Sequence, residues 1–323
     1  MSEGEAPAQT QRSARSWVRT RRGAYAALLF LTLIWGANWI AMKLALEHSD
    51  PVTFNIQRTW FAVLVLFGVM IAERGLRVPT SWSAVIVTGL LQTTINFGST
   101  TMALAGGAPG RTSVLVFTMP FWTLLIAWPV LGERVRGSQW LAICLAFAGL
   151  LLLVAPWDWH GAIAPRLWAV LSGFGWAAGT VATKYFQRAR GFDMRSFMAW
   201  QMLIGVLPLS LLPWFLDLPG TQWSVTQVLL FIHVSAISTA LGFLLWTEVL
   251  RFLPAGTASL NMFAIPVIAL LLSMAIFDER LARSEWVGIA CIGTGLVLVS
   301  WRALRATRKG ETPPPEPTPL EGG

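Results

Sequence analysis

Residues 114–154, VLVFTMPFWTLLIAWPVLGERVRGSQWLAICLAFAGLLLLV, return later in the chain as residues 260–300, LNMFAIPVIALLLSMAIFDERLARSEWVGIACIGTGLVLVS. One constant offset aligns the two stretches and superimposes identical residues: Pro120 on Pro266, Glu133-Arg134 on Glu279-Arg280, Trp140 on Trp286 and Gly149 on Gly295. Further upstream, Trp35-Gly36-Ala37 with Lys43 matches Trp176-Ala177-Ala178 with Lys184. A duplicated half inside an apolar chain is typical of membrane transporters built from two repeats.

The composition favours a membrane protein over a soluble one. Of the 323 residues, 55% are hydrophobic and only 12% are charged, whereas a soluble domain carries about 25% charged residues. The net charge of +8 does not indicate a nucleic-acid partner, because the Arg residues lie in short segments between apolar runs, as the positive-inside rule requires. Cys144 and Cys291 both lie inside apolar runs, so we expect no disulfide.

Hydropathy divides the chain into about ten apolar stretches of membrane-spanning length. They cover residues 24–46, 51–72, 83–104, 109–131, 138–155, 166–185, 195–215, 225–250, 255–277 and 286–301. Open backbone is not tolerated in lipid, so these stretches predict an all-α integral membrane fold. The predicted organisation is a basic segment 1–23, a first five-helix repeat 24–155, a second repeat 166–301 and a disordered tail 302–323.

The distribution of Lys and Arg predicts the orientation in the membrane. An even number of spans puts both termini on one side, and a cytoplasmic position for both places most basic loop residues inside. Each half has an odd number of spans, so the second half is inverted relative to the first. Inverted repeats of this kind give a site at the midplane two alternating exits.

These features resemble a known family of transporters. Trp35-Gly36 lies early in the first span, and a Pro within a later span is followed by Gly132-Glu133-Arg134 or Asp278-Glu279-Arg280. The chain resembles the drug/metabolite transporter superfamily over about residues 24–301, most closely its EamA-type ten-helix exporters. The resemblance implies secondary transport, mostly outward, of amino acids, other metabolites or toxic compounds.

One departure from the superfamily concerns proton coupling. Its four-helix multidrug members carry a proton-coupling Glu eight residues before a Lys in the first span. At that spacing before Lys43 and Lys184, this chain has Trp35 and Trp176. We therefore do not expect proton antiport by that mechanism, and coupling to protons or another ion stays open.

Polar and aromatic residues inside the spans are the candidates for the solute site, because polar groups in lipid are costly unless they face the bundle or water. In span three, residues at helical spacing form one face: Gln92, Asn96, Ser99, Thr100 and Ala103. The repeat-related face in span eight contains Ser238, Thr239, Gly242, Phe243 and Trp246. Either face lines the cavity or packs against a neighbouring helix through small and polar residues.

Spans one, two and six add further candidates. Trp35 and Asn38 share a face of span one, and Trp176 is the repeat partner of Trp35. These tryptophans either frame the solute or face lipid. Arg58 lies inside span two, where it either pairs with Glu47 or Asp50 or holds a substrate carboxylate.

The remaining residues of note have structural and functional interpretations. Pro120 and Pro266 are expected to kink spans four and nine, as hinges for alternating access or as static features. The Glu-Arg pairs at 133 and 279 are expected to anchor loops rather than to form gates. Glu248 is expected to pair with Arg251 along one helix, and a lone His233 gives only weak support for a proton role.

No enzyme signature is present in the chain. There is no GxSxG, HExxH, GxGxxG or GxxxxGK[ST] motif, so we expect no catalysis, no cofactor and no metal. The favoured function is a secondary exporter of small metabolites or drugs in a bacterial inner membrane. An uptake permease of the same fold, a membrane protein without transport and an intramembrane enzyme are the alternatives. The expected partners are a small-molecule solute and the bilayer, and the sequence does not indicate an oligomeric state.

Overall fold

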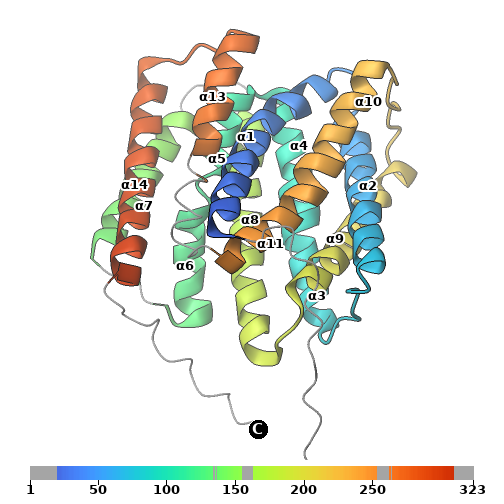
Figure 1. The fold of residues 1–323 in the computed structure, drawn as a ribbon. Coiled ribbons are helices and arrows are strands. Elements are labelled where there is room, and N and C mark those ends of the chain that lie inside the picture. The colour runs from blue at the N-terminus through green and yellow to red at the C-terminus, as the bar shows by residue number, and fades with distance from the viewer. Residues whose placement is uncertain are drawn as a thin grey trace, which may run out of the picture.

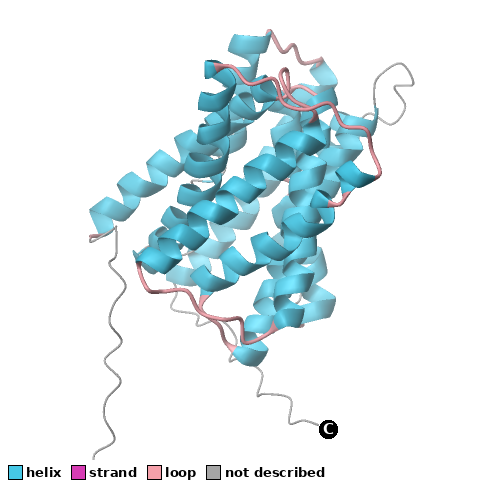
Figure 2. Ribbon diagram, turned by 90° about the vertical axis from the view of Figure 1, so that its right-hand side faces the viewer, coloured by secondary structure: helices cyan, strands magenta, loops and turns pink. Residues whose placement is uncertain are grey.

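The computed structural model describes residues 20–133, 135, 137–154, 163–252, 262 and 264–308, and these residues form helices and loops without a strand. Figure 1 shows the helices side by side in one bundle. Figure 2 shows the connecting loops gathered at its two ends. The helices combine into ten segments that cross the bundle, so the predicted all-α fold of two five-helix inverted repeats is confirmed.

The first half contains five crossing segments. They are α1 (Arg21–Ala45), α2 (Pro51–Ala72), α3 (Trp82–Thr88) continued by the π-helix η1 (Gly89–Ile95) and α4 (Asn96–Gly106), α5 (Pro109–Val116) followed by α6 (Met119–Leu131), and α7 (Ser138–Val154). Asp50 begins α2 by accepting hydrogen bonds from the amides of Val52 and Thr53, with Pro51 as the first helical residue. This is the standard chemistry of a helix N-terminus.

The second half repeats this order. It contains α8 (Ile163–Arg190), α9 (Met194–Ser210) with the 3₁₀ turn η2 (Leu212–Trp214), α10 (Val225–Ile232) continued by the π-helix η3 (His233–Leu241) and α11 (Gly242–Phe252), α13 (Ala264–Phe277), and α14 (Arg283–Arg308). Five stretches of the described chain are long and apolar enough to cross a membrane: Arg22–Ala45, Pro51–Ala72, Pro109–Leu131, Met194–Trp214 and Val225–Trp246. The start of the predicted span 255–277 and most of the two terminal segments lie outside the described residues.

Spans three and eight share a feature that the hydropathy pattern does not reveal. Each contains a stretch of π-helix, η1 in the first half and η3 in the second. The offset that carries Pro120 onto Pro266 carries all of η1 onto the last seven residues of η3. A π-helical turn widens a helix by one residue and is frequent at functional sites.

Span four is interrupted near Pro120, as expected. Helix α5 ends at Val116, the backbone turns through Phe117 and Thr118, and α6 begins at Met119 with Pro120 in its first turn. Proline lacks the amide hydrogen that a continuous helix would need at this place. Its repeat partner Pro266 lies in α13, close to residues outside the described part of the chain. Whether either proline acts as a hinge stays a prediction.

The two halves interleave rather than stand apart. Helix α1 packs against η3 and α11 of the second half, and α8 packs against η1 and α4 of the first. Helices α7 and α14 lie side by side, and Gly149 and Gly288 allow their backbones to approach closely. Small residues at such crossings are the usual way for membrane helices to pack.

Candidate functional site

Trp35 of α1 contacts the helix that contains η3. Its indole Nε1 donates a hydrogen bond of 2.9 Å to the carbonyl oxygen of Ser238, and its ring centroid lies 6.1 Å from that of Trp246. A Cβ atom at Gly242 would lie 2.6 Å from the same indole nitrogen. Only glycine therefore lets the helix approach Trp35 in this way.

Trp176 of α8 reaches the same stretch of the second half. Its ring centroid lies 6.1 Å from that of Phe243, the residue next to Gly242. Both tryptophans are half-buried and contact ring systems of another span. The structure thus brings the repeat-related pair to neighbouring positions of one helix, and solute contact by either residue stays a prediction.

The polar face of span three meets α8. Gln92 Nε2 donates to Thr180 Oγ1 at 3.2 Å, and Asn96 Nδ2 donates to both Oγ and the carbonyl oxygen of Ser172 at 2.9 Å. Thr100 Oγ1 lies 2.6 Å from Ser172 Oγ. All of these candidates are buried and make helix-to-helix hydrogen bonds, which is the packing interpretation of this face.

Thr239 and Trp246 represent the matching face of span eight. Thr239 Oγ1 donates a hydrogen bond of 2.7 Å to the carbonyl oxygen of Val234, five residues earlier in the same helix. The separation of five residues matches the π-helix, in which hydrogen bonds join residues five apart rather than four. Trp246 lies beside Trp35, so the face of span eight contacts α1. The face of span three contacts α8 instead.

Arg58 of α2 is 4% exposed, and its surroundings differ from the expected ion pair. Within the described part of the chain no carboxylate pairs with it: neither of the expected partners, Glu47 and Asp50, does so, and Asp50 instead caps α2. Arg58 Nε donates to Asn55 Oδ1 at 3.0 Å, and the guanidinium lies 4.5 Å from the ring centroid of Phe97. Asn38 and Arg58 both contact the sulfur of Met42.

A charged cluster lies at one end of the bundle, and the sequence had indicated only its Glu279, as part of a loop anchor. The buried carboxylate of Glu279 accepts hydrogen bonds from the amides of Gly110 and Arg111 at 3.0 and 3.1 Å, and from the Ser273 hydroxyl. Arg111 Nε also donates to Glu279 at 3.1 Å, and Arg111 NH1 donates to Glu285 at 2.8 Å. We call this end of the bundle the Glu279 end. The negative charge stabilises the N-terminus of α5.

The opposite end, here the Glu133 end, has a different arrangement. Glu133, the repeat partner of Glu279, accepts from Lys184 at 2.5 Å and from Arg188 at 2.7 Å. Glu248 forms an ion pair with Arg195 of α9, which also pairs with Glu73 at 3.2 Å. The side chain of Arg251, the expected partner of Glu248, lies outside the described residues.

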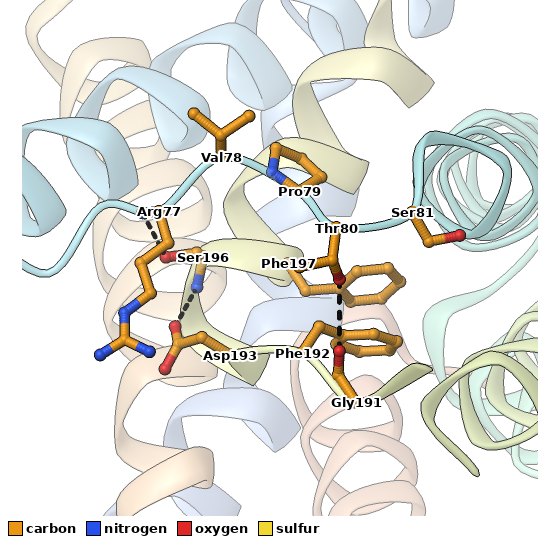
Figure 3. A pocket seen from close by; sticks show the side chains of 10 residues that line it. All are labelled: Arg77, Val78, Pro79, Thr80, Ser81, Gly191, Phe192, Asp193, Ser196 and Phe197. Carbon is orange, nitrogen blue, oxygen red and sulfur yellow. Dashed lines mark hydrogen bonds between the residues drawn. The ribbon is translucent and has the colours of Figure 1, made fainter. Parts of the chain in front are cut away.

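Two pockets lie at the ends of the bundle rather than beside the candidate residues. One of about 420 Å³ lies between the loop after α2 and the start of α9, where Thr80 donates to the carbonyl of Gly191 and Phe192 stacks on Phe197 (Figure 3). The other, of about 330 Å³, lies beside Arg111 and Glu279. Neither contains a residue of the predicted solute site. The described residues hold no cluster of His, Cys, Asp or Glu suited to a metal ion.

Two inverted five-helix halves, each placing its first helix against the π-helical span of the other, define an integral membrane protein with the architecture of a transporter. The chain belongs to the EamA-like transporter family, whose model matches residues 22–155 and again 165–301. The resemblance seen in the sequence is therefore confirmed.

Curated relatives extend over nearly the full chain. An uncharacterized transporter of Bacillus subtilis, YvbV, is 29% identical over 279 residues, covering 85% of this chain and 91% of its own. A probable amino-acid metabolite efflux pump of Escherichia coli is 25% identical and covers 88% and 97%. One solved crystal structure matches with a TM-score of 0.61 at 19% identity, over 88% of this chain and 99% of its own. That structural likeness shows the fold alone.

Proposed function

We propose that the protein is a secondary transporter that exports small metabolites, amino acids or related compounds, or drugs, by alternating access. It would act as a multi-pass protein of a bacterial inner membrane, with both termini in the cytoplasm. The family and the efflux pumps among the relatives support transport as the function. Export as the direction draws on those relatives and on the resemblance of the sequence.

One observation carries the proposal: the two repeat-related tryptophans meet adjoining residues of one π-helical span. Trp35 contacts Ser238 and Gly242, and Trp176 contacts Phe243. In inverted-repeat transporters the solute binds where the repeats meet near the midplane. A tryptophan offers a large, stiff apolar face there, suited to an amphipathic solute.

The proposed solute site contains the residues named from the sequence: Trp35, Asn38, Arg58, Gln92, Asn96, Thr100, Trp176, Thr239 and Trp246. Pro120 and Pro266 are the proposed hinges. Alternating access would repack the contacts of α1 with η3 and of α8 with η1, because those contacts join the two halves.

A growth screen tests the function. Cells that overproduce the protein are grown on toxic amino acids, amino-acid analogues and dyes. Export predicts increased resistance, and an uptake permease predicts increased sensitivity to the same compound. The matched variant Trp176→Ala should alter which compounds have an effect, while Trp→Phe at the same position should be milder. Unchanged growth on every compound, with protein present in the membrane, would contradict the proposal.

Reporter fusions test the orientation. The predicted topology puts residues 48 and 220 outside the cell and both termini inside. The backbone carbonyl oxygen of His48 accepts a hydrogen bond of 2.8 Å from the backbone amide of Gln222, so the loops after α1 and before α10 lie on the same face. A fusion at either terminus that reports the outside would overturn the orientation.

A further inference from the structure

Arg58 has a full positive charge inside the bundle and only neutral neighbours in the described part of the chain. Asn55 Oδ1 accepts from its Nε, the weakly accepting Met42 sulfur lies 3.9 Å from NH1, and Phe97 covers the guanidinium. The carboxylates that pair across the bundle serve other cations: Glu279 and Glu285 serve Arg111, Glu133 serves Lys184 and Arg188, and Glu73 and Glu248 serve Arg195.

This arrangement is expensive if it serves only the fold. An arginine has five N–H donors, and an intramembrane cation without an anion costs several kcal/mol. A structural role would be met better by a carboxylate partner or by an apolar side chain of similar volume. The missing negative charge therefore points to an anionic ligand.

Asn38 supplies a complementary group beside the cation. Its Oδ1 is buried and accepts no hydrogen bond from any described residue. Its Nδ2 lies 3.2 Å from the sulfur of Met42, the same atom that Arg58 contacts. The side chains of Arg58 and Asn38 thus meet at one sulfur atom, and the amide of Asn38 has an oxygen that accepts no hydrogen bond from a described residue. Unsatisfied buried acceptors of this kind are rare in folded proteins.

We propose that Arg58 and Asn38 select the solute by two adjacent groups. Arg58 binds a carboxylate, and Asn38 Oδ1 accepts from an ammonium or another donor next to that carboxylate. The substrate class is then carboxylate-bearing solutes with a neighbouring donor, and the same positive charge excludes organic cations. This inference rests on the proposed transport function and narrows it, because it separates amino-acid-like solutes from cationic drugs.

Matched solute trios test the proposal with the purified full-length protein in detergent. Each trio contains an amino acid, the same molecule without its amino group, and the same molecule without its carboxylate. Phenylalanine, leucine and threonine supply aromatic, aliphatic and hydroxylated trios. Binding is measured as the rise in melting temperature, which follows ligand affinity for the folded state.

The variants separate the two anchors. Arg58→Gln should weaken binding of both carboxylate members at least tenfold, and Arg58→Lys should recover part of the loss. Asn38→Leu should weaken the amino acid and leave the des-amino acid unchanged. Thr59→Val is the matched control, since Thr59 is buried one residue away and donates only to its own helix, to the carbonyl of Asn55. It should bind like the parent.

Three results overturn the proposal: the decarboxylated amine binds as well as the amino acid, Arg58→Gln keeps carboxylate binding, or no member of any trio binds. The growth screen distinguishes this failure from failure of the function. If cells become resistant to dyes but the purified protein binds no carboxylate, transport is supported and the role of Arg58 is rejected. Carboxylate binding in a protein that moves no compound would support Arg58 and reject transport.

Discussion

The two ends of the bundle contain the same sequence feature in different physical settings. Glu279 has a side chain that is 1% exposed and holds the N-terminus of α5, Ser273 and Arg111 together. Its repeat partner Glu133 has a side chain that is 38% exposed and contacts only cationic side chains of α8 among the described residues. Both carboxylates therefore contact the other half of the chain, and of the two Glu279 alone is buried and bonded to backbone amides.

This difference shows that one duplicated carboxylate can be held with different strength in the two halves. A buried carboxylate with several donors is strongly held, whereas an exposed one exchanges partners with water at little cost. Four variants test the comparison, from the largest expected effect to the smallest.

Glu279→Gln should have the largest effect. The amide presents one acceptor oxygen where the carboxylate presents two, and its NH₂ group opposes the donors of α5. We expect a loss of about 3 kcal/mol in the free energy of unfolding, as for a broken buried pair, measured by thermal unfolding in detergent. Equal stability of this variant and Glu133→Gln would remove the basis of the comparison.

Gly242→Ala tests the middle of the bundle without changing either end. The added methyl would lie 2.6 Å from Trp35 Nε1, so the indole must move and lose its hydrogen bond to Ser238. The expected cost is about 1–3 kcal/mol, with altered solute selectivity. Gly293→Ala is the control, because nothing lies within 4 Å of its Cβ position. In a Trp35→Phe background the cost of Gly242→Ala should shrink if the clash is with the indole.

The double change Gln92→Leu and Asn96→Leu tests the contact of span three with α8. It removes the donors to Thr180 and Ser172, and interhelical hydrogen bonds in membranes are worth about 1 kcal/mol each. Transport should fall more than the amount of folded protein in the membrane. Thr101→Val is the control, since Thr101 bonds only within its own helix. Normal transport by the double variant would assign this face to packing.

Glu133→Gln should have the smallest effect on stability. Its ion pairs with Lys184 and Arg188 are partly exposed, so we expect less than about 1 kcal/mol. The difference from the parent should shrink further at high salt, because salt screens exposed pairs. Thermal unfolding at low and high ionic strength provides the measurement. A large, salt-independent loss would mean that the carboxylate is held as firmly as Glu279.

Much of the fold could be predicted from sequence because lipid leaves few choices. The apolar stretches 51–72 and 109–131 begin and end at the same residues as the corresponding spans, α2 and α5–α6. The repeat itself indicated which residues of the two halves correspond. The sequence also contains a signal for the role of Asp50, since Asp followed by Pro is a typical helix start. That signal predicts that Asp50 caps α2 and does not pair with Arg58.

The rest of the site depends on contacts between distant segments. Arg111 and Glu279 are 168 residues apart, and nothing in either neighbourhood indicates that α5 and α13 meet. The π-helical turns were also missed, because one extra residue shifts the hydrophobic periodicity too little to detect in an almost uniformly apolar span. Gln92, Asn96 and Thr100 of span three all hydrogen-bond to α8, but that α8 is their neighbour follows only from the packing of the bundle.

The matching π-helical turns belong to the repeated unit rather than to either half alone. Both fall at the same register of the repeat, and the two halves correspond through spans three to five without a residue gained or lost between the turn and Gly149 or Gly295. A substitution that restores a regular α-helix in one of these spans would therefore have an equivalent position for comparison in the other half.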